Sequence, residues 1–304
     1  MSFLNPVNEP VKHFKSTDAD APQIDYSARV AGDIKAVLKA CLVDGYGATA
    51  GAGWSIVNEV DHVAEFVSPS AAMSGYLIGI DDSSASQTYW YYESTKSDIN
   101  NVSKNASSID TSSTEHSWDV LVTERGIMLI ETVFNKAIKA TGSSITYWGR
   151  LKSAVSSSGQ KNIAWWCLGY NSPAPNGGRP SDFFSNSFSS SKRRYQLGDL
   201  ALSSDAHPAI EVFRHYSSNS GTPDITEIIV SAEWYLISEA NIVAQQPSVF
   251  LQTKKQTETY SKNTGTHNGR PALYVWPIRD TTSISYLFHS SNVIVIIYLD
   301  YWEY

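Results

Sequence analysis

One stretch of the chain repeats its apolar residues at the spacing of an α-helix. These residues recur three and four positions apart and form one stripe, made of Val30, Ile34, Val37, Leu38, Cys41 and Leu42. Asp25 or Ser27 can cap the start of this helix, and Gly45 can end it in the left-handed conformation. A weaker pattern of the same kind predicts a second helix over residues 131–140, with apolar residues at Val133, Phe134, Ala137 and Ile138.

Most of the remaining apolar residues fall in short runs rich in Val, Ile, Tyr and Trp, which are typical of β-strands. They predict strands at residues 54–60, 63–67, 75–80, 88–93, 118–123, 127–130, 147–151, 163–169, 209–215, 225–230, 272–276 and 293–299. No helix alternates regularly with these strands, which disfavours a doubly wound parallel sheet. The expected fold class is mainly β, with antiparallel sheets or a β-sandwich, one or two short helices and long irregular loops.

The chain is long enough for one large domain or two smaller ones. We expect an extended N-terminal arm over residues 1–21, an N-terminal α+β or β domain over 22–152 and a β-rich C-terminal domain over 153–304, with a single continuous unit as the alternative. The arm holds Pro6 and Pro10 and has little apolar periodicity, so we expect it to have no fold of its own and to become ordered on a neighbouring subunit. Its deletion is then predicted to leave a folded chain that no longer assembles. Three polar stretches are predicted to be long loops: 94–117, 171–191 and 252–270.

Composition narrows the class of protein. Of the 304 residues, 42% are hydrophobic, which is too apolar for disorder, and 17% are charged, which is low for a free-floating surface. Aromatic residues reach 12%, and Tyr and Trp are favoured at contacts between proteins. The net charge of -7 gives no overall attraction to the phosphates of nucleic acids. The densest basic run, Lys192-Arg193-Arg194, is predicted to be a solvated turn, so no nucleic-acid partner is expected.

The cysteines and the apolar segments indicate the cellular compartment in which the protein is made. Cys41 lies on the stripe of the first predicted helix and Cys167 lies in an apolar run, so both are predicted to be buried free thiols, with a disulfide between them as the alternative. The N-terminus has neither the basic nor the apolar region of a signal peptide. The longest apolar run, residues 293–299, is about seven residues long, whereas a membrane-spanning helix needs ~20. We therefore expect synthesis and assembly in a cytoplasm, without membrane insertion.

The sequence contains none of the common catalytic signatures. The nucleophile elbow G-x-S-x-G, the zinc motif H-E-x-x-H, the phosphate-binding G-x-x-x-x-G-K-[ST] and a C-x-x-C pair are all absent. A glycine-rich stretch follows the first predicted helix but misses the dinucleotide-binding spacing; it comprises Gly45, Gly47, Gly51 and Gly53. We interpret this stretch as a flexible connection. No catalytic residue, cofactor-binding residue or metal ligand is predicted, and the chain is expected not to be an enzyme.

The titratable side chains show no pairing that requires a metal or an acid–base mechanism. No two of the seven histidines have the i, i+4 spacing of a helical metal pair; they are His13, His62, His116, His207, His215, His267 and His289. His207 and His215 have an even separation on or beside one predicted strand, which strand packing explains. Asp81 and Asp82 end a predicted strand. Turn formation explains these adjacent carboxylates better than glycoside cleavage, which needs two carboxyl groups across a cleft.

Runs of adjacent aromatic residues point most directly to binding. Because side chains alternate along a strand, residues 89–92, 165–166 and 301–304 place rings on both faces of their strands. One face can enter a core, and the other must meet a second layer, a partner subunit or a ligand. A subunit interface is the favoured interpretation for a chain with so little charge. The alternative is a glycan-binding surface, with platforms such as Tyr89, Trp90 and Tyr91.

Two segments of the chain carry motifs of a known family. Residues 11–22 contain a Lys–aromatic pair, Ser-Thr, small residues and Ala-Pro. A helix follows that ends in the turn Cys41-Leu42-Val43-Asp44-Gly45-Tyr46-Gly47, and Gly53-Trp54 then opens the first strand. These features resemble the opening of a set of tailed-bacteriophage virion proteins. Residues 269–278 are similar to a late Gly-Arg-x-Pro-Gly-x-Trp-x-Pro segment of the same proteins, with Ala272-Leu273-Tyr274 where the family more often has Pro-Gly-Leu.

This resemblance implies a structural component of the virion, usually in the tail or its attachments, with no catalytic residue to carry over. The expected function is a non-enzymatic subunit of the tail, baseplate or neck, which assembles through ring-like contacts with its own copies and with other virion subunits. The alternatives are a host-glycan-binding (receptor-binding) module of the tail, which would bind a host surface glycan, and a capsid decoration protein. A glycan-cleaving enzyme would need two facing carboxylates, and the sequence singles out none. The expected location is the virion, after assembly in the cytoplasm of the bacterial host.

Overall fold

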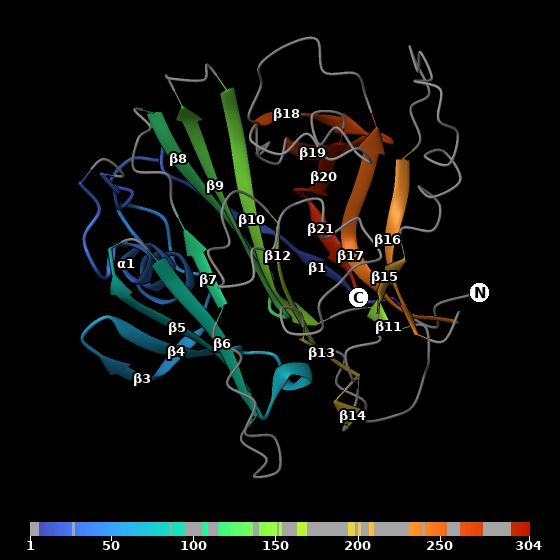
Figure 1. Ribbon diagram of the computed structural model, residues 1–304, viewed down its shortest axis with the longest axis horizontal. Coiled ribbons are helices and arrows are strands. Elements are labelled where there is room, and N and C mark those ends of the chain that lie inside the picture. The colour runs from blue at the N-terminus through green and yellow to red at the C-terminus, as the bar shows by residue number, and fades with distance from the viewer. Residues whose placement is uncertain are drawn as a thin grey trace.

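The fold is mainly β: in the computed structural model most of the described residues lie in strands, which form several antiparallel sheets beside one short α-helix (Figure 1). This confirms the predicted fold class. The structure describes residues 6–25, 28–85, 87–94, 105–108, 115–135, 140–150, 152–153, 163–168, 194–197, 200–201, 207–209, 231–238, 241–253, 262–275 and 293–304. Within these ranges no helix has both the length and the apolar character needed to cross a membrane.

A first seven-stranded sheet carries the middle of the chain, and its strands pair antiparallel in the order β14-β13-β12-β10-β9-β8-β2. The strands are β2 (Lys12–Lys15), β8 (Glu115–Val122), β9 (Gly126–Asn135), β10 (Ala140–Arg150), β12 (Ile163–Leu168), β13 (Arg194–Leu197) and β14 (Leu200–Ala201). β8, β9 and β10 correspond to predicted strands but are longer. The reason is that backbone hydrogen bonds extend the ladder into polar residues, which a search for apolar runs leaves out.

A five-stranded sheet precedes it in the chain, in the order β3-β4-β5-β6-β7. Its strands are β3 (Ser55–Val60), β4 (Val63–Val67), β5 (Tyr76–Ser84), β6 (Gln87–Ser94) and β7 (Asn105–Ser108), and a 3-10 turn, η3 (Ala71–Met73), connects β4 to β5. The four predicted strands in this region are confirmed, and β4 has the predicted bounds. β7 lies within the stretch 94–117 that was predicted to be a loop. Its composition, Asn-Ala-Ser-Ser, carries no strand signal of its own.

A second seven-stranded sheet holds the C-terminal part of the chain, and most of its strands are orange or red in Figure 1. Its strands are β15 (His207–Ala209), β16 (Ser231–Ser238), β17 (Asn241–Thr253), β20 (Val293–Tyr298), β19 (Arg270–Val275) and β18 (Lys262–His267), with β11 (Lys152–Ser153) paired to β17. β19 and β20 confirm two predicted strands. β18 corrects the predicted loop 252–270. Of the predicted strand 209–215 only Ala209 is described, and 225–230 lies outside the described residues.

The predicted second helix is wrong over residues 131–135, which belong to β9. Glu131 pairs with Trp118 of β8 on one side and with Ser144 of β10 on the other, so the segment is a central strand. The four-residue spacing of Val133 and Ala137 looked helical. Two neighbouring strands that satisfy the backbone hydrogen bonds override such a weak local preference. Residues 136–139 of this prediction lie outside the described residues.

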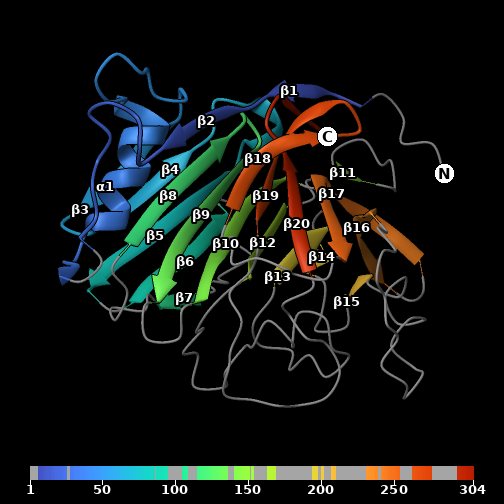
Figure 2. The same cartoon turned by 90° about the horizontal axis from the view of Figure 1, so that it is seen from above.

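The N-terminal arm is extended, as predicted, but it is ordered on its own chain. β1 (Asn8–Pro10) pairs antiparallel with β21 (Tyr301–Glu303), and β2 pairs with β8. Phe14 belongs to the main hydrophobic core and is only 1% exposed. Figure 2 shows β2 and β1 in dark blue along one border of the molecule, with the C-terminus close to β1. The expectation that this arm has no fold of its own is therefore wrong for residues 8–15.

The position 152/153, expected to separate two domains, falls inside a continuous arrangement of sheets. β10 ends at Arg150 and pairs with β12, which begins at Ile163, within one sheet. Lys152 and Ser153 form β11 and pair with Gln245 and Ala244 of the other large sheet. The chain therefore passes from one large sheet to the other at this point, and the first sheet continues beyond it.

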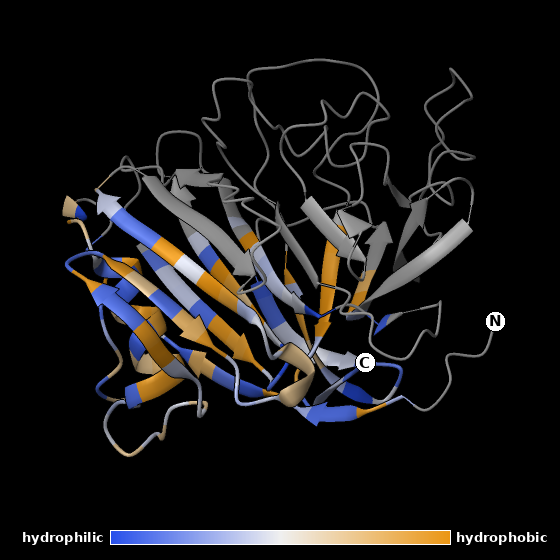
Figure 3. Ribbon diagram, turned by 90° about the horizontal axis from the view of Figure 1, so that it is seen from below, coloured by the Kyte–Doolittle hydropathy of each residue, from blue (hydrophilic) through white to orange (hydrophobic). Residues whose placement is uncertain are grey.

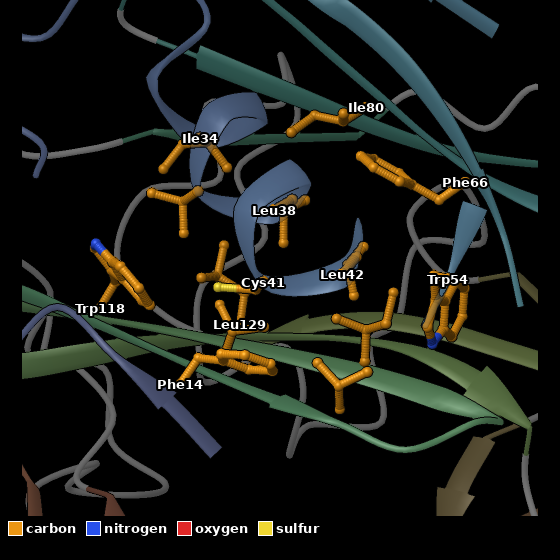
Figure 4. Close-up of a cluster of buried hydrophobic side chains, with 14 of the residues drawn as sticks. Phe14, Ile34, Leu38, Cys41, Leu42, Trp54, Phe66, Ile80, Trp118 and Leu129 are labelled. Atoms are coloured by element: carbon orange, nitrogen blue, oxygen red, sulfur yellow. The ribbon is translucent and has the colours of Figure 1, made fainter. Parts of the chain in front are cut away.

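The main core is a helix enclosed between two sheets (Figure 4). α1 (Asp33–Lys39) continues into a π-helical turn, η2 (Ala40–Asp44). Its apolar side chains meet the five-stranded sheet on one side and the first seven-stranded sheet on the other; the labelled residues are Ile34, Leu38, Cys41, Leu42, Ile80, Phe66, Trp54, Trp118, Leu129 and Phe14. Each fully buried side chain of this size contributes about 1.5–3 kcal/mol. In Figure 3 orange and blue segments alternate along the strands nearest this core, as one-sided burial requires.

The helix confirms the predicted stripe except at Val30, which precedes the helix and is exposed. Gly45 ends it with a positive φ of 78°, as predicted, although its ψ of -179° is extended and not helical. The cap of the helix start differs from the prediction. Asp25 accepts a hydrogen bond from the Ala28 N–H, upstream of the helix, and Ser27 lies outside the described residues. The carboxylate that caps the helix comes instead from Asp82 on β5, through the N–H groups of residues 34 and 35.

Candidate functional site: a charged cluster between the two large sheets

The most developed cluster of titratable side chains joins three parts of the fold. Asp119 on β8 is 3% exposed at its side chain, and His13 Nε2 lies 2.8 Å from its Oδ1. Lys262 Nζ, from β18 of the other large sheet, pairs with Asp119 Oδ2. We call these residues the His13–Asp119–Lys262 cluster. It connects the N-terminal arm, the first seven-stranded sheet and the β18–β19 hairpin.

Strand register explains why these side chains meet. Lys15 lies directly opposite Asp119, and His13 lies opposite Leu121. His13 is therefore the diagonal neighbour of Asp119, and residues two positions apart on paired strands share one face of the sheet. The ring of His13 reaches the carboxylate without any change of register.

The charge state of Asp119 follows from its neighbours. Burial raises the pKa of Asp119, but the hydrogen bond from His13 and the positive charge of Lys262 outweigh burial, so this pKa lies below its ordinary value. The carboxylate is therefore ionised at neutral pH and held by two partners. A buried carboxylate with this support stabilises the contact between the elements that carry the partners.

The cluster has one element of catalytic geometry and lacks others. A histidine bonded to a carboxylate is the arrangement that orients a general base. A base also needs a nucleophile or a substrate proton on its other side, and no described contact provides one. In the part of the chain that the structure describes, no three His, Cys, Asp or Glu side chains are placed to hold a metal ion. The arrangement is suited to holding the hairpin against the sheet.

A second charged group lies at the end of the same hairpin. The guanidinium carbon of Arg270 lies 3.7 Å from the ring centroids of both Tyr298 and Tyr301. Its Nε and Nη2 donate to the carboxylate of Asp300 at 2.9 and 2.6 Å. The hydrogen bond from Arg270 holds the pKa of Asp300 below its ordinary value. Stacking on two rings together with a two-point carboxylate bond uses features of arginine that lysine lacks.

The hairpin turn itself is built from Asn268 and Gly269, whose φ angles are 50° and 77°. Two consecutive positive φ values are the requirement of a two-residue hairpin turn, which Asn-Gly meets best. His267, which precedes the turn, packs with its ring centroid 5.4 Å from that of Phe250 and 6.0 Å from that of Tyr298. Burial lowers the pKa of His267. The segment 269–278, which carries the late resemblance, thus begins in a turn with a structural role.

The remaining histidines lie on different elements of the fold or outside the described residues. His62 occupies the turn between β3 and β4, and His116 lies on β8. His207 begins β15, with its side chain outside the described set, and His215 and His289 lie outside the described residues. The predicted basic turn is likewise outside at residues 192–193, while Arg194 begins β13.

The turn predicted at Asp81 and Asp82 is wrong for Asp82. β5 continues through both residues to Ser84, and Asp82 is fully buried in an ion pair with Arg29. Its other oxygen, Oδ2, accepts the Ile34 N–H at 2.8 Å. Asp81 does accept a local bond from the Ser83 N–H, at 3.2 Å. Sequence reasoning missed the Arg29–Asp82 pair because its members are 53 positions apart.

Two of the three C-terminal rings, on one face of residues 301–304, enter the core as expected, while Tyr301 on the other face is partly buried and lies against the guanidinium of Arg270. Trp302 and Tyr304 are buried, and the Trp302 indole N–H donates to the Tyr298 carbonyl at 3.0 Å. The Tyr304 hydroxyl lies 2.8 Å from Thr123 Oγ1. For the runs 89–92 and 165–166, including the glycan platforms Tyr89, Trp90 and Tyr91, the side chains lie outside the described set.

Two further predictions concern the region that carries the phage resemblance. Cys41 is buried and free, as predicted, and burial raises the pKa of its thiol far above the ordinary value. The side chain of Cys167 lies outside the described set. The glycine-rich stretch serves close packing: a Cβ on Gly51 would lie 2.3 Å from the carbonyl oxygen of Val43. The stretch is therefore a connection, as predicted, but a closely packed one and not a flexible one, since the N–H groups of Ala52 and Trp54 donate to the carbonyls of Cys41 and Leu42.

No protein-family model matches this chain, and no curated protein matches it.

Proposed function

We propose that this chain is a non-enzymatic structural subunit of a tailed-bacteriophage virion, in its tail, baseplate or neck. The proposal rests on the structural position of residues 11–54, which resemble the opening of such proteins. They form β2, the helix and the entry into β3.

The resembling residues supply part of the main core. Phe14, Cys41, Leu42 and Trp54 all belong to the core cluster between the two sheets. Tyr46 packs there too, and its hydroxyl donates to Asp18 Oδ2 at 2.9 Å. Residues in these positions determine how the chain folds. The resemblance therefore concerns the fold of a structural subunit.

The charged residues support a structural role as well. Arg29 and Asp82 neutralise each other inside the core, and Asp119 is held by His13 and Lys262. Glu59 is bonded by Lys35 and Lys39 at 2.9 and 2.8 Å. Each of these groups is paired in a contact that connects elements of the fold. Low total charge and internal pairing suit a chain that is surrounded by other subunits.

Immunogold electron microscopy of the phage that encodes this chain tests the proposal. An antibody raised against the recombinant chain is expected to label intact particles at the tail, baseplate or neck. Label over the head would move the chain to the capsid, as a decoration protein. An antibody that detects the chain in infected cells but labels neither intact nor partly disrupted particles would contradict a virion role.

A further inference from the structure

We propose that Glu9 makes β1 a pH-sensitive latch, which holds the N-terminal segment to the C-terminal strand more tightly in mild acid than at neutral pH. β1 belongs to a sheet of two strands, and β21 is its one partner among the strands that the structure describes. The pair lies at the border of the molecule, with the C-terminus close by (Figure 2). A strand with a single partner can open locally while the larger sheets stay intact.

Glu9 is the only buried residue of β1. Asn8 and Pro10 are exposed, whereas Glu9 is only 6% exposed. In the register of β1 with β21, Glu9 lies opposite Trp302, and cross-strand partners point to the same face. Trp302 is fully buried, so the carboxylate of Glu9 is directed into the interior as well. The attachment of this strand therefore depends on one titratable side chain.

The buried carboxylate of Glu9 is only partly satisfied. Arg125 Nε lies 2.5 Å from its Oε1, but this contact lacks the direction of a hydrogen bond. The other oxygen, Oε2, is buried and has no hydrogen-bond partner in the part of the chain that the structure describes. A buried oxygen without a partner costs free energy, and the cost is greatest when the group is charged. Protonation of Glu9 therefore lowers the cost of keeping β1 in place.

The charged and titratable groups around Glu9 come from three parts of the fold. Glu124 and Arg125 lie in the turn between β8 and β9, Arg150 ends β10, and Tyr304 follows β21. Burial raises the pKa of Glu9 and outweighs the positive charge of Arg125, and the negative charge of Glu124 raises this pKa further. The pKa of Glu9 therefore lies above its ordinary value of 4.5.

The direction of the pH effect follows from this shift. A carboxyl group with a raised pKa binds its proton more tightly in the closed ribbon than in the open one, where it meets water. The closed ribbon is therefore most stable below the ordinary pKa of 4.5, and it loses stability as the pH rises from there through the pKa of the closed state. Asp119, whose pKa is lowered, affects stability in the opposite direction and at lower pH.

Arg125 does not oppose the protonation of Glu9. Its side chain is 18% exposed, and its guanidinium carbon lies 5.6 Å from the centroid of the Tyr304 ring. The guanidinium thus keeps its contact with water and with an aromatic ring when Glu9 is neutral. Protonation leaves no isolated buried charge behind.

The segment that can detach ends before β2. β2 is fixed by its pairing with β8 and by Phe14, which is 1% exposed. The segment ahead of it is held by the short ladder between β1 and β21 and by two backbone hydrogen bonds between Val7 and Tyr304. Opening of residues 6–11 therefore uncovers β21 and leaves the large sheets in place.

Hydrogen exchange of the isolated full-length chain, followed by NMR, tests the latch without any particle. The reporter is the Tyr304 N–H, which donates to the Val7 carbonyl in the closed ribbon. Its protection, corrected for the intrinsic exchange rate and compared with that of the β9 amides, is expected to be greater at about pH 4.5 than at about pH 7.5. Equal protection at the two pH values, or weaker protection in acid, would overturn the proposal.

Two variants identify the group responsible. Glu9→Gln keeps the shape of the side chain without its charge, so its Tyr304 protection is expected to be the same at both pH values and close to that of the wild type in acid. The matched control, Glu303→Gln, removes a carboxylate of the same ribbon that is 40% exposed and paired with Lys152, and it is expected to keep the wild-type pH dependence. Circular dichroism checks that both variants fold. A Glu9→Gln chain with the wild-type pH dependence would overturn the role of Glu9.

A second experiment measures Glu9 in the unaltered chain. The glutamate side-chain carboxyl carbons are isotope-labelled, and NMR follows the Glu9 signal, assigned through its own backbone, across the acid range. Its titration midpoint is expected to lie above the ordinary value of 4.5. A midpoint at or below that value would overturn the proposal, whatever the variants do.

Discussion

At the scale of single residues, the fold depends on charges that are buried together. Arg29 and Asp82 have fully buried side chains and form an ion pair, and Asp82 also caps the helix. The His13–Asp119–Lys262 cluster has the same character at the junction of the large sheets. The sequence could not reveal either group, because its members are 53 to 143 positions apart and only the tertiary fold brings them together. Cys41 could be predicted, since helical periodicity is a local signal.

Replacement of Asp82 tests the value of the buried pair. Asp82→Asn removes the counter-charge of a buried guanidinium, so the free energy of unfolding is expected to fall by about 3–5 kcal/mol. Urea denaturation followed by circular dichroism measures the change. The control Asp81→Asn alters the neighbouring, partly exposed carboxylate and is expected to change stability by about 0.5 kcal/mol or less. Equal effects of the two substitutions would contradict the assigned role of Asp82.

The lowered pKa of Asp119 predicts a pH dependence of stability. A carboxyl group whose pKa is lower in the folded than in the unfolded chain stabilises the fold above its unfolded pKa of about 3.9. This contribution is lost as the pH falls through the folded pKa. Asp119→Asn is therefore expected to be less stable than the wild type at pH 7, with a difference that narrows below about pH 4. A difference that stays constant from pH 7 to acid would contradict the ionised cluster.

At the scale of elements, local patterns predicted most of the strands and missed those that depend on partners. β4 was predicted to the residue because its apolar residues are bounded by turns on both sides. The polar composition of β18 predicts a loop, although its turn, Asn268-Gly269, is a strong hairpin signal that identifies the strand. Residues 131–135 have a helical spacing of apolar residues, but they form a strand because they pair with β8 and β10. The sequence pattern does not predict that the N-terminal arm is ordered on its own chain, because its apolar anchor, Phe14, is a single residue.

The arm is expected to stabilise the folded chain as an element. Deletion of residues 1–21 removes both β1 and β2, and with them the buried Phe14. The free energy of unfolding is therefore expected to fall, with Phe14→Ala alone costing about 3–5 kcal/mol. Thermal and urea unfolding measure both variants. Deletion of residues 1–5, which keeps β1 and β2, is the control and is expected to have little effect. A deletion of 1–21 as stable as the wild type would show that the arm contributes only to assembly.

At the scale of the whole molecule, long-range pairings close the chain on itself. Val7 and Tyr304 exchange two backbone hydrogen bonds, each of 2.9 Å, and β1 pairs with β21. The Asp119–Lys262 pair and the β11–β17 pairing hold the two large sheets together. We therefore expect assembly to use surfaces of the folded chain and not an unfolded arm.

The central claim, a structural subunit of the virion, is tested most directly by the copy number of the chain in purified particles. Quantitative mass spectrometry with isotope-labelled peptides gives the ratio of this chain to a known tail protein in gradient-banded, salt-washed phage. The account predicts a fixed whole-number ratio that is the same in independent preparations. A chain that washes off the particles or appears in variable trace amounts, while most of it stays in the soluble lysate, would contradict the account.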